Sequence, residues 1–152
     1  MSAIPQGYHS VTPSLTVRDG AAALDFYARA FGAVEVFRMP EPSGKIMHAE
    51  ITIGDSRLML SDEYPDYGSL APEPGKGGAF MIYVTDVDAA FEQAVAAGAT
   101  PMQPPTDMFW GDRSGKVNDP YGYRWTLASH VRDVSQEDME AAAKAWAEGN
   151  EG

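Results

Sequence analysis

The sequence predicts an α+β fold in which two β-α-β-β-β modules form a half-open barrel and a short C-terminal helix follows. The main observation is an internal repeat, in which a short strand ends at Asp19 in one copy and at Asp86 in the other. A helical pattern follows each Asp and closes on Gly-Ala, at 32–33 and at 98–99. A hairpin signal then follows each helix, with strand-like runs on both sides of a glycine-containing turn. The same order of parts occurring twice defines the architecture.

The composition indicates one globular domain over residues 1–152, or two half-domains that share a core. A chain of 152 residues with 44% hydrophobic and 22% charged residues can fold without disulfides or a structural metal. The 22 acidic residues against 11 basic ones give a net charge of −11. That charge argues against nucleic acid and against anionic membranes as partners.

The residue inventory excludes several chemistries. The chain has no cysteine, which removes disulfide frameworks, thiolate zinc sites and cysteine nucleophiles. Residues 1–7 lack the basic start and apolar core of a signal peptide, and no apolar run reaches the ~18 residues of a membrane span. We therefore expect a cytoplasmic protein without a membrane partner.

Caps and turns delimit the modules. Asp19 and Asp86 are suitable N-caps, and apolar residues recur at helical spacing after both. We expect module 1 over about residues 8–63, a linker at 64–78, module 2 over about 79–130 and a helix over about 135–148. The remaining expected strands are 34–39, 45–53 and 57–62 in module 1 and 100–103, 115–118 and 123–129 in module 2, with a loop at 104–114. The apolar face of the C-terminal helix would dock on its own domain or on a partner subunit.

Strand alternation predicts which side chains face away from the helices. A three-residue turn at 54–56 would place His48 opposite Asp62 and Glu50 opposite Leu60, all on that face. The two halves should build one curved sheet, whose concave face mixes polar, aromatic and thioether groups as small-molecule pockets do. In module 2 the residues expected on this face include Met81, Tyr83, Arg124 and Thr126.

These parts resemble the vicinal oxygen chelate superfamily, the group of glyoxalase I, bleomycin-resistance proteins and extradiol dioxygenases. The resemblance covers about residues 8–130 and is carried by Asp19 with the aromatic pattern up to residue 33 and by DPYGYRW at 119–125. Three further segments are similar to its PhnB-like branch: HAE at 48–50, WGDR at 110–113 and HVRDVS at 130–135. The resemblance also implies a homodimer, in which pairing covers sheet edges and completes pockets.

The superfamily's enzymes hold a divalent metal with four side chains, usually His, Glu, His and Glu. Counted from the Asp and Gly landmarks, the resemblance places those positions at Thr12, Leu60, Ala79 and Thr126. None of them is an imidazole or a carboxylate, the donors that such a metal needs. We therefore expect no metal and no other cofactor, with a divalent metal as the alternative.

That alternative depends on His48, Glu50 and Asp62. These side chains would form a displaced metal site, or a base whose pKa is raised by a carboxylate. The simpler interpretation is a cross-strand ion pair at the edge of a cavity. His9 and His130 lie near the ends of the domain, where surface or packing roles are expected.

The loop at 104–114 carries Trp110, Asp112 and Arg113. Arg113 would bind a ligand carboxylate or phosphate as a fork, and Trp110 would stack on a planar ring. Alternatively, Asp112 and Arg113 pair to pin the loop while Trp110 fills the core. The basic residues are scattered, so a phosphonate pocket has no support, although Arg113 and Arg124 could converge.

Three functions follow as hypotheses. The first is a small-molecule-binding protein that lacks the family's usual metal site, with antibiotic sequestration as a variant. The second is a metal-dependent lyase, isomerase or dioxygenase with noncanonical ligands, and the third is a scaffold with a filled cavity. The expected ligand pocket consists of His48, Glu50, Leu60, Asp62, Met81, Tyr83, Trp110, Arg113, Arg124 and Thr126.

Overall fold

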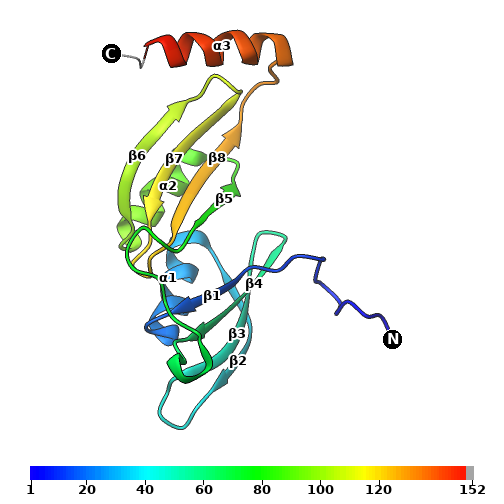
Figure 1. Ribbon diagram of the computed structural model, residues 1–152, viewed down its shortest axis with the longest axis vertical. Coiled ribbons are helices and arrows are strands. Elements are labelled where there is room, and N and C mark those ends of the chain that lie inside the picture. Colours follow the sequence, from blue (N-terminus) through cyan, green and yellow to red (C-terminus); the bar gives the residue numbers. More distant parts are fainter. Residues whose placement is uncertain (150–152) are drawn as a thin grey trace.

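The computed structural model describes residues 1–149 and has the predicted α+β architecture of two β-α-β-β-β modules and a C-terminal helix (Figure 1). The modules lie one above the other along the long axis of the molecule. Module 1 consists of β1 (Ser14–Val17), α1 (Gly20–Phe31), β2 (Val34–Pro40), β3 (Ile46–Ile53) and β4 (Ser56–Asp62). A short 3₁₀ helix, η1 (Pro65–Tyr67), lies in the linker. Module 2 consists of β5 (Ala79–Tyr83), α2 (Val87–Ala97), β6 (Thr100–Asp107), β7 (Asp112–Asn118) and β8 (Arg124–His130), and α3 (Gln136–Gly149) follows.

Each module has its own open sheet, and the two sheets have the same topology. The strand orders are β1-β4-β3-β2 and β5-β8-β7-β6, with a parallel first pair and antiparallel pairs after it. The expectation of one continuous curved sheet is wrong, because no ladder joins the two sheets within residues 1–149. The modules meet instead through packed helices and aromatic side chains.

The helices begin and end where the sequence predicts. The Asp19 side chain accepts a hydrogen bond from the Ala22 N–H, and Asp86 does the same for Ala89, each at 3.1 Å. The chain leaves α1 through Gly32, whose φ of 69° is in the left-handed region that glycine adopts without strain.

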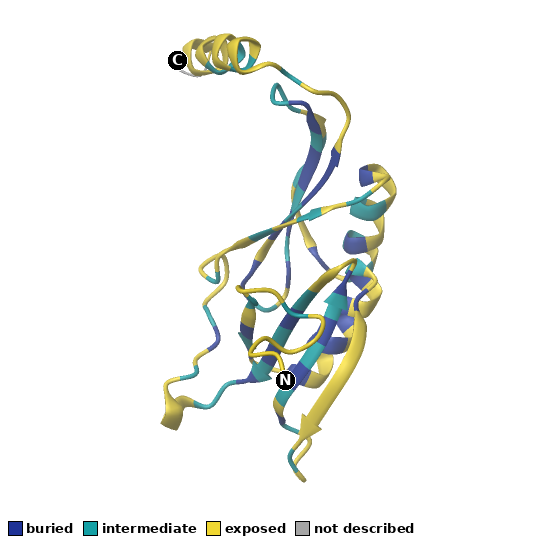
Figure 2. Cartoon of the chain, turned by 90° about the vertical axis from the view of Figure 1, so that its right-hand side faces the viewer, coloured by how far each residue is buried: buried dark blue, intermediate teal, exposed yellow. Residues whose placement is uncertain are grey.

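One buried carboxylate joins the modules. Asp119, in the turn before β8, accepts hydrogen bonds from the Tyr27 hydroxyl at 2.6 Å and the Trp125 indole N–H at 2.8 Å. The backbone N–H groups of Tyr121 and Tyr123 also donate to it. Tyr27 belongs to α1 of module 1, so the carboxylate fixes the position of one module against the other. Buried residues gather in the sheets and along α1 and α2 (Figure 2).

One segment of module 2 differs from the prediction. The segment expected as a loop at 104–114 is mostly strand, because β6 continues to Asp107 and β7 begins at Asp112. The prolines of β6 are tolerated because it is an edge strand, where a missing N–H costs no ladder hydrogen bond on the open side.

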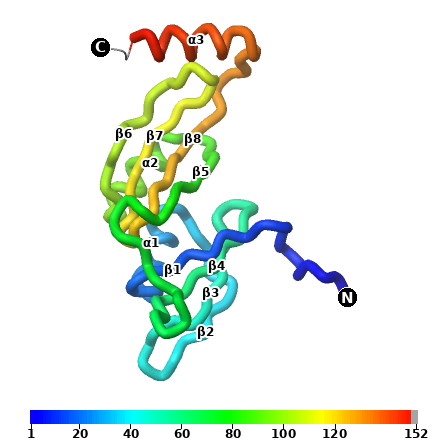
Figure 3. The backbone as a smooth tube through the Cα atoms, in the orientation of Figure 1, coloured from blue at the N-terminus to red at the C-terminus, as the bar shows by residue number. Residues whose placement is uncertain are grey.

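The C-terminal helix α3 has no buried residue and lies beyond module 2 (Figure 3). No helix among residues 1–149 is long and apolar enough to cross a membrane.

Candidate functional site

A cavity of about 310 Å³ lies where the β3–β4 turn of module 1 faces the edge strand β5 of module 2. Its wall is largely aromatic and aliphatic, and polar groups at Asp55, Ser56 and Tyr83 lie among them. An apolar enclosure with a few polar groups is the usual form of a small-molecule site. The remaining lining residues are Pro13, Ile53, Gly54, Leu58, Phe80, Met81, Ile82 and Trp125.

Of the ten predicted pocket residues, Met81 and Tyr83 line this cavity and the other eight do not. Met81 and Tyr83 are 50% and 62% exposed in the single chain. Thr126 is the β8 neighbour of Met81 in the parallel ladder. Arg124 lines a different cavity, of about 340 Å³, together with Met102 and the linker end.

His48 and Glu50 contact each other within β3, and not across strands as expected. The His48 Nε2 atom lies 3.2 Å from a Glu50 carboxylate oxygen, and both side chains are partly buried. The ring of Phe37 lies beside His48, with centroids 6.3 Å apart. This arrangement matches a local ion pair on one strand.

The predicted register of the β3–β4 hairpin is wrong by one residue. The turn contains only Gly54 and Asp55, so Ile53 pairs with Ser56 and Ala49 with Leu60. A shift of one residue moves every side chain of a strand to the other face. Leu60, with 1% exposure, therefore lies in the core.

Asp62 moves to the buried face with Leu60. Its two carboxylate oxygens accept hydrogen bonds from the N–H groups of Gly20, at 2.9 Å, and Ile46, at 2.7 Å. The carboxylate satisfies the first N–H of α1 and the start of β3, a structural role. It does not join His48 and Glu50.

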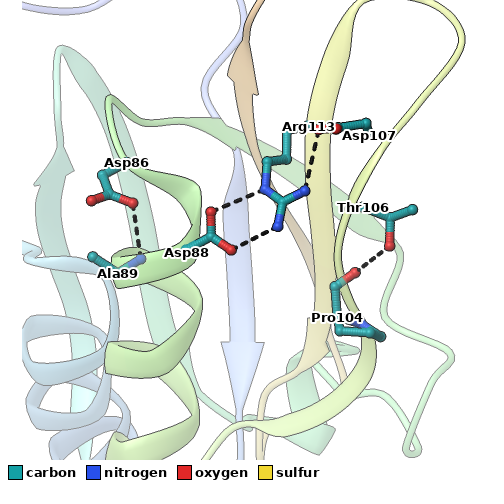
Figure 4. Close-up of polar contacts among 7 residues, drawn as sticks. All are labelled: Asp86, Asp88, Ala89, Pro104, Thr106, Asp107 and Arg113. Carbon is teal, nitrogen blue, oxygen red and sulfur yellow. Dashed lines mark hydrogen bonds and ion pairs between the residues drawn. The ribbon is translucent and has the colours of Figure 1, made fainter.

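Arg113 lies between two aspartates, Asp88 and Asp107 (Figure 4). Its guanidinium donates two hydrogen bonds to Asp88 of α2, at 3.0 and 2.9 Å, and a third to Asp107 of β6 at 3.2 Å. These hydrogen bonds raise the pKa of Arg113, and the guanidinium lowers the pKa of Asp88. The fork ties α2 to the sheet, so it neither converges with Arg124 nor pairs with Asp112.

Trp110 lies in the turn between β6 and β7. Its ring meets that of Phe109 edge to face, with centroids 4.9 Å apart, and the side chain is half-buried. The cavity between the modules is lined by other residues. Trp110 therefore belongs to the far end of module 2.

Sequence reasoning missed a chain of polar side chains at that end of module 2. Buried Asp112 accepts a hydrogen bond from the Tyr83 hydroxyl at 2.9 Å, and its other oxygen lies 2.8 Å from Nδ1 of His130. Nε2 of His130 lies 2.7 Å from Asp133. Hydrogen bonds to Asp133 and Asp112 raise the pKa of His130, and the bond to Asp112 raises that of Tyr83. The spacing of His130 and Asp133, within a motif already noted, was the available signal.

The residues at the positions that the resemblance assigns to the superfamily's metal do not fit a divalent ion. Thr12, Ala79 and Thr126 offer at most hydroxyl oxygens, and Leu60 is buried in the core. The β4 neighbours on the opposite face, Met59 and Ser61, supply neither imidazole nor carboxylate. No group of three or more His, Asp or Glu side chains among residues 1–149 is arranged to hold a metal ion.

The fold and the sequence together identify the family. The model of the glyoxalase/bleomycin resistance protein/dioxygenase superfamily matches residues 8–127. The chain belongs to this superfamily. Both β-α-β-β-β modules lie almost entirely within the matched residues.

Its relatives include proteins without an assigned function. An uncharacterized protein of Mycobacterium tuberculosis, Rv0887c, is 41% identical over 145 residues, which cover 92% of this chain and 85% of that protein. TioX from Micromonospora sp. ML1 has 29% identity and a TM-score of 0.67, covering 82% of this chain and all of TioX. A glyoxalase-related enzyme from Fulvimarina pelagi has 26% identity and a TM-score of 0.64, covering 80% of this chain and 88% of its own.

Proposed function

We propose that this protein binds a small aromatic or heterocyclic molecule in the cavity between the modules, without a metal ion. The cavity itself carries the proposal, because its volume of about 310 Å³ and its Phe80, Trp125 and Met81 walls suit a flat apolar ligand. Tyr83, Asp55 and Ser56 supply polar groups that would orient it.

Filling the cavity tests this proposal. Nile red, a flat uncharged heterocycle, should bind to the protein, and Met81→Trp should weaken that binding by about tenfold or more, because the new ring occupies the cavity. Met47→Trp is the matched control, since Met47 is a similarly exposed methionine on β3 that does not line the cavity. Fluorescence titration measures both affinities. Equal affinities in the two variants would contradict the proposal.

A metal-dependent lyase, isomerase or dioxygenase is the second candidate, favoured only by the His48–Glu50 contact. Asp62 is not available as a third ligand because two backbone N–H groups occupy its oxygens. Equilibration with Zn²⁺, Ni²⁺, Mn²⁺ or Fe²⁺, followed by removal of free ions and elemental analysis, separates the two. A stoichiometric ion that His48→Ala abolishes would establish the second candidate and reject the first.

We also infer a cytoplasmic homodimer of the PhnB-like branch. The motifs at 110–113 and 130–135 support the branch. The open sheet edges and the exposed apolar side chains of β2, among them Val34, Phe37 and Met39, support pairing with a second copy. Sedimentation of the purified protein should give twice the mass of one chain, and a single-chain mass at high concentration would refute the dimer.

A further inference from the structure

The strongest unexplained feature is the polar chain at the end of module 2, here called the His130 clamp and formed by Tyr83, Asp112, His130 and Asp133. Its members come from β5, β7, β8 and the segment that leads to α3. Asp112 is 4% exposed, whereas the Asp133 side chain is fully exposed. The His130 clamp does not depend on the cavity between the modules, although Tyr83 lines that cavity and is also a member of the clamp.

The geometry of the clamp requires a protonated histidine. Both ring nitrogens of His130 lie within 2.8 Å of carboxylate oxygens. Ionised carboxylates only accept hydrogen bonds, and a neutral imidazole carries a single N–H. Only the imidazolium form donates to Asp112 and Asp133 together.

Loss of the proton would break one of these two bonds, and burial decides which. Asp112 is shielded from water and fixed by the Tyr83 hydroxyl, so the remaining N–H stays on its side. Asp133 exchanges its partner for water at little cost because it is fully exposed. The bond to Asp133 is therefore the one that depends on protonation.

The bond between His130 and Asp133 ties the segment that leads to α3 to the end of β8. Residues 131–135 connect β8 to the helix, and the N–H groups of Val131 and Arg132 donate to the Gly111 carbonyl. Gly111 has a φ of 103°, and a Cβ there would collide with the Arg132 carbonyl oxygen, so this end of the segment packs closely against Gly111. After Arg132, the His130–Asp133 contact attaches the next part of the segment. The segment ends at Ser135, whose hydroxyl caps α3 by accepting a hydrogen bond from the Asp138 N–H.

We propose that His130 is a pH-sensitive latch, whose protonated ring fixes the direction in which α3 projects and whose neutral ring releases it. The charged or titratable groups at the ring are Asp112 from β7 and Asp133 from the connecting segment, with Tyr83 of β5 acting through Asp112. Arg113, adjacent to Asp112, is committed to Asp88 and Asp107. The raised pKa of His130 agrees with this arrangement and shifts the release to a higher pH than that at which a free histidine loses its proton.

The absence of cysteine allows a direct test. Cysteines introduced at Glu92, exposed on α2, and at Lys144, on α3, give the only two sites for spin labels. Pulsed electron spin resonance on the full chain, diluted with unlabelled protein, then measures the distance distribution between the helices. We expect a narrow distribution at about pH 6 and a broad one at about pH 9.

Asp133→Ala separates the latch from a general effect of pH. This variant removes only an exposed carboxylate, so it should fold normally and give a broad distribution at both pH values. Asp66→Ala, which removes an exposed aspartate of η1, should behave like the parent chain. An unchanged distribution between the two pH values in the parent, or a narrow one in Asp133→Ala, would overturn the proposal.

Discussion

Asp62 of module 1 and Asp112 of module 2 are buried carboxylates near the same end of two sheets with equal topology. Asp62 is held by two backbone N–H groups, from Gly20 and Ile46. Asp112 is held by two titratable side chains, Tyr83 and His130. The first arrangement is fixed at every pH at which the carboxylate is ionised, whereas the second changes with the protonation of its partner.

The difference shows how a duplicated fold divides its tasks. Module 1 uses its carboxylate to secure the start of α1 and of β3. Module 2 places its carboxylate between an exposed tyrosine that also lines the cavity and an exposed histidine that also contacts Asp133, in the segment before α3. The same backbone therefore carries a structural anchor in one half and ionisable chemistry in the other.

Removing the anchor of module 1 should have the largest effect. Asp62→Asn replaces an acceptor oxygen by an NH₂ group, which leaves a buried backbone N–H of Gly20 or Ile46 without a partner. We expect a loss of about 2–3 kcal/mol in the free energy of unfolding, measured by urea denaturation. Asp55→Asn, in the exposed turn, is the control and should be nearly neutral.

The corresponding change in module 2 should cost less stability but alter a titration. Asp112→Asn leaves donors on Tyr83 and His130 that reach water, so the expected loss is about 1 kcal/mol. The pKa of His130 should fall, because one of the two carboxylates that stabilise the imidazolium has lost its charge. Nuclear magnetic resonance titration of the ring measures this shift. A larger loss of stability than in Asp62→Asn would remove the contrast between the modules.

The pH dependence of stability should originate in module 2. The pKa of His130 is higher in the folded protein than in the unfolded chain, so its contribution is complete below about pH 6.5 and is lost as pH rises through the folded-state pKa. His130→Gln should therefore flatten the stability curve above about pH 6.5. Urea denaturation at several pH values provides the comparison.

The smallest expected effect concerns the tyrosine shared by the clamp and the cavity. Tyr83→Phe removes the hydroxyl that donates to Asp112, and should lower the free energy of unfolding by about 0.5–1 kcal/mol, because the buried Asp112 loses one donor and keeps the other, His130. Without the Tyr83 hydrogen bond, the negative charge of Asp112 acts more strongly on His130, so the pKa of His130 should rise above its value in the parent chain. A fall in that pKa would show that Tyr83 does not act through Asp112.

The sequence predicted only those parts of the candidate site that follow from the alternation of side chains along one strand. Alternation correctly placed Leu15 and Val17 in the core and left Met81 and Tyr83 exposed beside the cavity. The register of β3 and β4 depends on whether a turn has two or three residues, and glycine-containing turns of both lengths form hairpins. That single residue moved Leu60 and Asp62 from the expected pocket into the core.

The sequence by itself determined the two modules, the caps of α1 and α2, and the buried faces of β1, β3 and β8, because these properties depend on residues close together in the chain. The tertiary structure decided which side chains meet. Arg113 contacts Asp88 from 25 positions away, and Tyr83 contacts Asp112 from 29 positions away. Such contacts depend on strand register and on how helices lie over the sheets, since a long side chain takes whichever partner the packed elements bring within reach.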